Sequence, residues 1–345
     1  MNQSLVSVIL LNYNSLKYLS GQSFLQKNME CLQKQTYPNL EIIAVDNAST
    51  DGSVEYIVAN FPKVKLAKNE RNLGFCGGNN RGIRESKGDY VLFLNQDVFL
   101  DPDYIERIIE FLENNPKAAG AMGKLLRYNL LKQENTNIID SLGIVIFKNG
   151  RAIERGELEE DRGQYDQTAE VFGISGAASV FRRSALEDAK VGNEYFDEDF
   201  FMYKEDIDLS WRLRLLGWNL WCVPQAKAYH ARTSGGTGKS GSYVAHFLDF
   251  IKNEKKKPAY VRGLSMKNQW LLLIKNLSPG QFFRWFPFIL WRESQLLGVN
   301  LLFSPKTFLG YLKIFFSQLL SVWNKRRTMV LKKSVKYSEV IHWFN

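Results

Sequence analysis

Short apolar runs alternate with helix-like segments through the first hundred residues. Apolar, often β-branched residues fill 6–11, 40–45 and 90–94, and a weaker run covers 64–66. These runs are too short for helices, and uninterrupted apolar strands are typical of a sheet buried on both faces. The glycine-opened segment 74–86 predicts a helix between two of them. The chain is therefore expected to form an α/β fold with a doubly wound, mostly parallel sheet.

Polar side chains follow three of these strands directly. Asn12 follows the first, Asp46 the second, and Asn95 with Asp97 the last. Ligands of such sheets bind beyond the carboxyl ends of the strands. A turn also needs polar residues, which would explain any one position alone. Three together favour a ligand site.

The pattern changes after about residue 139. It predicts four further elements: a hairpin over 144–153 with a primed turn at Asn149-Gly150, a strand over 175–181, a helix over 203–216, and a strand over 218–223 that Pro224 ends.

The segment 196–208 carries six carboxylates among aromatic and apolar side chains. Glu205 and Asp206 lie in the first turn of the predicted helix, where the helix dipole favours ionised carboxylates. An ionised carboxylate in a partly apolar cleft can accept a proton from an attacking hydroxyl. The residues alone leave a simple helix-capping cluster equally open.

Asp97 and His230 form a second candidate pair. A carboxylate with an imidazole suits Mg²⁺ or Mn²⁺ bridging a diphosphate, although a lone histidine is more often structural. The Gly/Ser-rich segment 233–238 follows, and its composition predicts a lid over the site.

Other chemistries lack their motifs. No G-x-G-x-x-G follows the first strand and no G-x-x-x-x-G-K-[ST] occurs, so a dehydrogenase or phosphate-loop enzyme is not indicated. The three cysteines are scattered, which fits a reducing compartment and neither disulfides nor zinc. The first residues show no leader pattern, so we expect a cytoplasmic protein.

Charge divides the chain near residue 250. Residues 250–345 contain 17 Lys and Arg against 3 Asp and Glu, and five of the eight tryptophans. We therefore expect a catalytic domain over 1–245, with a nucleotide-binding half (1–100) and an acceptor half (101–245), followed by a basic aromatic helical region over 246–345.

The C-terminal region has three segments rich in Leu, Phe and Trp, at 264–277, 282–303 and 305–323. None is an uninterrupted apolar run long enough to cross a bilayer. Basic residues beside Trp and Leu are typical of helices that lie in a membrane interface. Packing on the catalytic domain or formation of a homodimer stays open as an alternative. No nucleic-acid-binding module accompanies the charge, so nucleic acid is not expected as a partner.

Six blocks in order resemble the family 2 glycosyltransferases of the GT-A fold, in their rhamnosyltransferase-like branch. The resemblance covers about residues 5–240 and is carried by Val6–Ile9 with Asn12–Asn14, Val45–Ser53, Asn72–Phe75 with Gly77–Asn80, Leu94–Asp97, Gly176-Ala177 before Arg182-Arg183, and Phe196–Glu198 with Glu205-Asp206, Asp208-Leu209, Arg212, Gly217-Trp218 and His230.

The resemblance implies roles for these residues. Asp206 would be the general base, with Glu205 and Asp208 in support. The nucleotide sugar would be bound by Asn12, Asp46, Asn72, Gly74, Asn79, Asn95 and Asp97, and Mg²⁺ or Mn²⁺ by Asp97 and His230. The family's D-x-D motif is Asn95-Gln96-Asp97 here, and the missing carboxylate should weaken metal binding.

The implied reaction is inverting transfer of a sugar, with L-rhamnose from dTDP-L-rhamnose favoured. The expected acceptor is a lipid-linked (polyprenyl-diphosphate) saccharide in bacterial surface-polysaccharide synthesis, at the inner face of the plasma membrane. Another hexosyl or galactofuranosyl transferase is the alternative. A nucleotidyltransferase is less favoured, because the glycine- and arginine-rich loop expected after the first strand is missing.

Overall fold

A ten-stranded sheet runs through the computed structural model, which describes residues 3–16, 23–232 and 256–345. The strand order is β10-β12-β6-β11-β4-β1-β2-β3, with β5 and β7 added beside β12 and β6. Its parallel half contains β1 (Val6–Asn12), β2 (Leu40–Asp46), β3 (Lys65–Lys68) and β4 (Tyr90–Asn95). Its mixed half contains β5 (Val98–Leu100), β6 (Ala118–Asn129), β7 (Glu134–Ser141), β10 (Ala169–Glu170), β11 (Ala178–Arg182) and β12 (Asn219–His230). The α/β fold class is confirmed.

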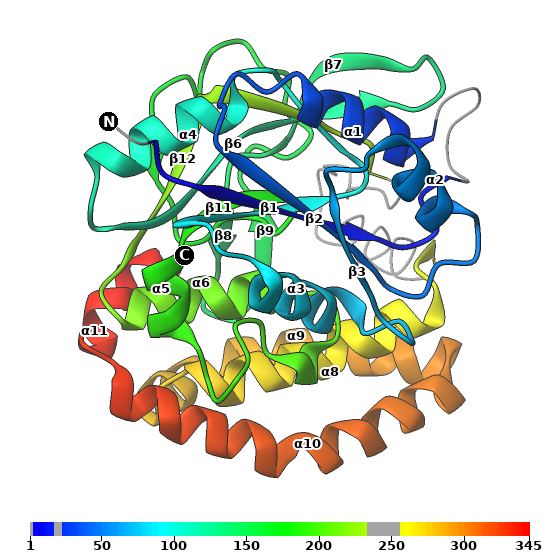
Figure 1. The fold of residues 1–345 in the computed structure, drawn as a ribbon. Coiled ribbons are helices and arrows are strands. Elements are labelled where there is room, and N and C mark those ends of the chain that lie inside the picture. The colour runs from blue at the N-terminus through cyan, green and yellow to red at the C-terminus, as the bar shows by residue number, and fades with distance from the viewer. Residues whose placement is uncertain (1–2, 17–22, 233–255) are drawn as a thin grey trace.

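Helices cover both faces of this sheet (Figure 1). One face carries α1 (Phe24–Gln33) and α4 (Tyr104–Asn114), and α2 (Ser53–Asn60) follows β2. The other carries α3 (Gly74–Glu85), α5 (Arg183–Ala189) and α6 (Glu205–Leu215). Beyond them lie α8 (Ala259–Asn276), α9 (Pro279–Phe303), α10 (Pro305–Lys332) and the short α11 (Tyr337–Val340).

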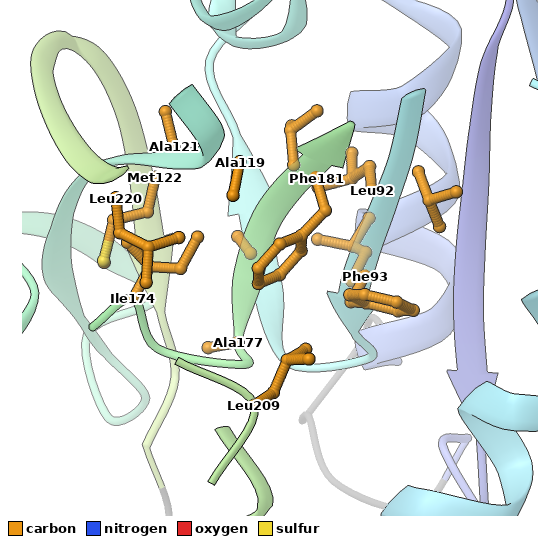
Figure 2. Packing of buried hydrophobic residues seen from close by; sticks show 14 of the residues in the cluster. Leu92, Phe93, Ala119, Ala121, Met122, Ile174, Ala177, Phe181, Leu209 and Leu220 are labelled. Atoms are coloured by element: carbon orange, nitrogen blue, oxygen red, sulfur yellow. The ribbon is translucent and has the colours of Figure 1, made fainter. Parts of the chain in front are cut away.

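Apolar side chains between the layers fix these positions. Figure 2 shows Phe93 of β4 and Phe181 of β11, whose ring centroids are 5.7 Å apart. Phe93 also meets Phe196, at 4.8 Å, so the start of the acidic segment is anchored in the sheet's core. Burial of such aromatic surface is a main source of stability.

The C-terminal helices pack onto the catalytic domain through buried charge. Lys275 Nζ of α8 lies 2.5 Å from Asp197 Oδ2 and 2.9 Å from Asp208 Oδ2. Near the other end, the Phe344 ring lies 4.9 Å from the rings of both Trp211 and Trp285. Packing on the domain, one of the two roles open for this region, is thus confirmed. The expected boundary near residue 245 and the predicted lid fall outside the described residues.

Two local predictions were wrong. The last strand does not end at Pro224: β12 continues to His230, and a register shift between Val223 and Lys227 accommodates the missing N–H. The hairpin of β8 (Ile144–Ile146) and β9 (Ala152–Glu154) exists, but its turn is not primed. Only Gly150 has a positive φ, of 74°, and Asn149 does not.

Candidate functional site

Three predicted site residues meet at one edge of the sheet. The register pairs Asn12 with Asp46 across β1 and β2, and Leu11 with Asn95 across β1 and β4. The strand-end positions therefore lie side by side, as parallel pairing requires.

The Asn12 side chain is completely buried and forms hydrogen bonds with other side chains of the protein. Its Nδ2 lies 2.8 Å from Asp46 Oδ1, 3.1 Å from Ser49 Oγ and 2.9 Å from Ser53 Oγ. The Ser15 hydroxyl donates to its Oδ1. Asn12 therefore orients the Asp46 carboxylate and the turn after β2.

The glycine-rich segment forms the start of α3. Gly74 has a φ of 69°, and its N–H donates to Asn72 Oδ1 at 2.8 Å. Its carbonyl accepts a bond from Asn47 Nδ2, which ties α3 to the turn after β2. Asn79, one turn further, donates to the Phe75 carbonyl at 3.0 Å, while its buried Oδ1 meets no partner among the described residues.

Asp97 and His230 come together through strand pairing. β5 runs antiparallel to the end of β12, and His230 Nε2 lies 3.4 Å from Asp97 Oδ2. His230 Nδ1 lies 2.8 Å from Asp140 Oδ2 on β7. A carboxylate on one ring nitrogen fixes the imidazole so that the other can bind a metal. Asp97 and His230 are thus the two candidate donors here, and no three His, Cys, Asp or Glu side chains in the described part of the chain form a group that could hold a metal ion.

Asp206 lies in the first turn of α6, with its carboxylate toward the lead-in to β11. Gly176 N–H donates to its Oδ2 at 3.3 Å, and Ile207 N–H to its Oδ1 at 2.8 Å. Burial raises the pKa of Asp206 despite these donors. Burial and the neighbouring Asp206 raise the pKa of Glu205 well above its ordinary value, and Glu205 Oε2 has no donor among the described residues. Glu205 therefore holds a proton more readily than an ordinary glutamate does.

A hydrogen bond and an electrostatic interaction connect the surroundings of Asp206 with the strand-end residues. Asn95 N–H donates to the Ala177 carbonyl at 2.9 Å, one peptide from the Gly176 amide that holds Asp206. Burial raises the pKa of Glu154 to about 7, and the charges of Asp206 and Asp140 both act on it. Asp206 and Asp140 thus both lie within electrostatic reach of Glu154.

The family model described as "Glycosyl transferase family 2" matches residues 7–189. The chain belongs to this family. It is 30% identical over 248 residues, covering 64% of this chain and 76% of the relative, to an N-acetylglucosaminyl-diphospho-decaprenol L-rhamnosyltransferase of Mycobacterium tuberculosis. It is 28% identical to a poly-β-1,6-N-acetyl-D-glucosamine synthase of Staphylococcus epidermidis, covering 73% of this chain and 58% of that one.

Solved structures show the same fold in distant proteins. The structure of GalNAc-T7 with UDP, GalNAc and Mn²⁺ superposes on this chain with a TM-score of 0.61 at 14% identity. The match covers 93% of the present chain and 58% of the GalNAc-T7 chain. S. aureus TarS gives a TM-score of 0.50 at 16% identity and covers 94% of this chain and 55% of its own. The predicted GT-A-like architecture is confirmed.

Asp208, predicted to support the base, has both oxygens engaged elsewhere. Arg212 Nε and Lys275 Nζ each lie 2.9 Å from Oδ2, and Asn276 Nδ2 lies 2.9 Å from Oδ1. Any influence of Asp208 on Asp206 therefore passes through α6, which contains both residues.

Sequence reasoning missed Asp140 and Glu154, because their partners are far away along the chain and neither belongs to a short motif.

Gly74→Ala should damage this site. Its Cβ would overlap the Phe201 carbonyl oxygen and ring, and the positive φ is strained for alanine. We expect a loss of roughly 2 kcal/mol in the free energy of unfolding in urea. Gly280→Ala on α9 is the control, because a Cβ there meets nothing within 4 Å. Equal stability of the two variants would contradict the packing described for Gly74.

Proposed function

We propose that this family 2 glycosyltransferase transfers L-rhamnose from dTDP-L-rhamnose to a lipid-linked saccharide, with inversion at the anomeric carbon. The sequence similarity to a rhamnosyltransferase that is named for a decaprenol-linked sugar supports the donor and the acceptor class. The observation that carries the proposal is the Asp206 carboxylate, whose hydrogen-bonded neighbour Gly176 adjoins the residue bound to Asn95 at the nucleotide end of the sheet.

The reaction follows from the charge on Asp206. Its carboxylate accepts the proton of an acceptor hydroxyl, and the hydroxyl oxygen forms a bond to the anomeric carbon from the face opposite the leaving group. The bond from that carbon to the diphosphate oxygen breaks, and the electron pair leaves with the nucleoside diphosphate. Asp46, Asn72, Gly74 and Asn79 would hold the nucleoside so that the attack is in line.

Asp97 and His230 would bind Mg²⁺ or Mn²⁺. A divalent cation supplies charge that offsets the negative charge of a leaving diphosphate. The Asp140 carboxylate on His230 Nδ1 supports this role, because it holds the ring with Nε2 toward Asp97.

The membrane surface is the proposed location of the acceptor. One stripe of α10 is exposed along its length and combines apolar with basic side chains: Leu309, Lys313, Phe316, Leu320, Trp323, Arg327 and Leu331. Its spacing of three or four residues puts these positions on one side of the helix. No Asp or Glu occurs in α10. No helix within the described residues is long and apolar enough to cross a bilayer. We propose that this stripe lies in the anionic interface of the inner leaflet.

Asp206→Asn should lower transfer by about 10²–10⁴-fold, because the amide cannot accept the proton. Nucleotide release measured across dTDP-, UDP- and GDP-sugars, with an acceptor present, would identify the donor and use this variant as the blank. Asp103→Asn, at a half-exposed pair with Arg107, is the matched control and should keep full activity. An Asp206→Asn enzyme with undiminished turnover would refute the assignment. Preference for a hexose or galactofuranose donor would favour the alternative transferase.

Asp97→Ala should remove the effect of metal on nucleotide binding. We expect the unaltered protein to bind dTDP more tightly with Mn²⁺ than with a chelator, measured by calorimetry, because a cation held by Asp97 would offset the charge of the diphosphate. The variant should bind equally weakly in both conditions, while Asp103→Ala keeps the difference. Full activity of Asp97→Ala in the presence of a chelator would overturn the metal role.

The double variant Leu320→Glu/Trp323→Glu should lose at least about tenfold in co-sedimentation with anionic vesicles, because it places charge in the apolar stripe. Leu131→Glu is the control, since Leu131 is 97% exposed on the turn between β6 and β7. High salt should weaken binding of the unaltered protein. If neither the unaltered protein nor the variants bind vesicles, and the double variant alone fails to form a dimer, the stripe is a homodimer interface.

A further inference from the structure

The backbone immediately before Asp206 has an uncommon conformation. Phe201, Tyr203 and Lys204 have φ values of 65°, 71° and 72°, in the left-handed region that side chains with a Cβ disfavour. This is why α6 begins at Glu205 and not at the predicted Tyr203. Such a run persists only where surrounding contacts determine it, and it is found at functional sites.

One side chain of the C-terminal region contacts this run directly. Asn268 of α8 is completely buried, and its Nδ2 lies 3.0 Å from the Phe200 carbonyl oxygen and 2.8 Å from those of Met202 and Tyr203. An amide group has two hydrogens, so it shares them among three acceptors. These carbonyls turn inward because of the left-handed residues.

Neighbouring contacts hold the rest of the run. Cys76 N–H of α3 donates to the Phe201 carbonyl at 3.0 Å from the opposite side. Lys267, adjacent to Asn268, donates to the Asp199 carbonyl. Lys325 of α10 pairs with Asp199 Oδ2 at 2.8 Å. The segment leading to Asp206 is therefore held between α3 and the C-terminal helices.

We infer that Asn268 is a positioning residue for Asp206, through which the C-terminal helices keep the base in place. This inference rests on the proposed function, since it assumes that Asp206 is the base. Without the amide, the Met202 and Tyr203 carbonyls lose this donor, whereas the Phe200 carbonyl keeps the Met202 N–H. The run can then relax, which displaces the first turn of α6. The C-terminal helices then carry both the proposed membrane-facing stripe, on α10, and the support of the base, on α8. Membrane binding and catalysis would therefore depend on the same group of helices.

Asn268→Leu tests this, with Asn300→Leu as a matched control. Asn300 of α9 is equally buried and donates to the Leu296 carbonyl at 2.8 Å, within its own helix. We expect Asn268→Leu to lower kcat by about tenfold or more, because small displacements of a catalytic group are costly. The Kd for dTDP should stay within about twofold. Asn300→Leu should leave kcat near the unaltered value. Equal losses in both variants would overturn the inference.

The pH profile separates positioning from a general loss of stability. Burial raises the pKa of Asp206, and Glu205, Lys204 and Glu154 are the charged groups around it. A base that gains access to water in Asn268→Leu should titrate lower, so the acid limb of kcat moves to lower pH. An unchanged limb would contradict a role for Asn268 in positioning Asp206.

Hydrogen exchange gives a reading that needs no turnover. Amides of 200–206 and the Cys76 amide should exchange at least about tenfold faster in Asn268→Leu and be unchanged in Asn300→Leu. If the unaltered protein transfers no sugar, the proposed function fails. If the amides of 200–206 exchange at the same rate in Asn268→Leu as in the unaltered protein, the inference about Asn268 fails independently. Asn268→Ser, which keeps one donor, takes the place of Asn268→Leu if the latter does not fold, with the same two outcomes.

Discussion

A buried cation between two buried carboxylates determines how the parts of this protein fit together. Lys275, Asp197 and Asp208 are almost fully buried, and within the described residues their charges pair with one another and with Arg212 and Lys325. Burial alone would raise the pKa of Asp197, but Lys275 and Lys325 hold it well below its ordinary range. Removing one partner of such a group costs about 3–5 kcal/mol, so α8 cannot separate easily from α6.

This constraint gives the C-terminal helices two different surfaces. Their inner side buries apolar side chains such as Leu272 and Trp285, and it also carries amides and lysines that donate to carbonyls and carboxylates of the segment before Asp206. The outer side of α10 is apolar and basic. Helices that served only as a membrane anchor would not need buried donors. The region therefore packs closely on the α/β fold and also presents an exposed apolar and basic face.

The strand-end residues and the acidic segment were predictable because they follow local rules. Asn12, Asp46 and Asn95 each come directly after an apolar run, and parallel pairing brings such positions together whatever the loops contain. Asp140 and Asn268 were not predictable in this way. Asp140 meets His230 across 90 residues of sequence, and Asn268 reaches its carbonyls across more than 60. No periodicity or short motif encodes contacts of that separation.

Sequence by itself therefore determined the α/β class, the family and the residues at the sheet's edge, since hydrophobic period and motif order are local properties of the chain. Only the tertiary structure decided which partners each carboxylate of the acidic segment has. Asp208 pairs with Arg212 and Lys275, and burial raises the pKa of both Glu205 and Asp206. Asp206 also accepts hydrogen bonds from backbone N–H groups. Three neighbouring acids of the same type differ in this way because burial and partners, which arise only on folding, set the energy of each charge.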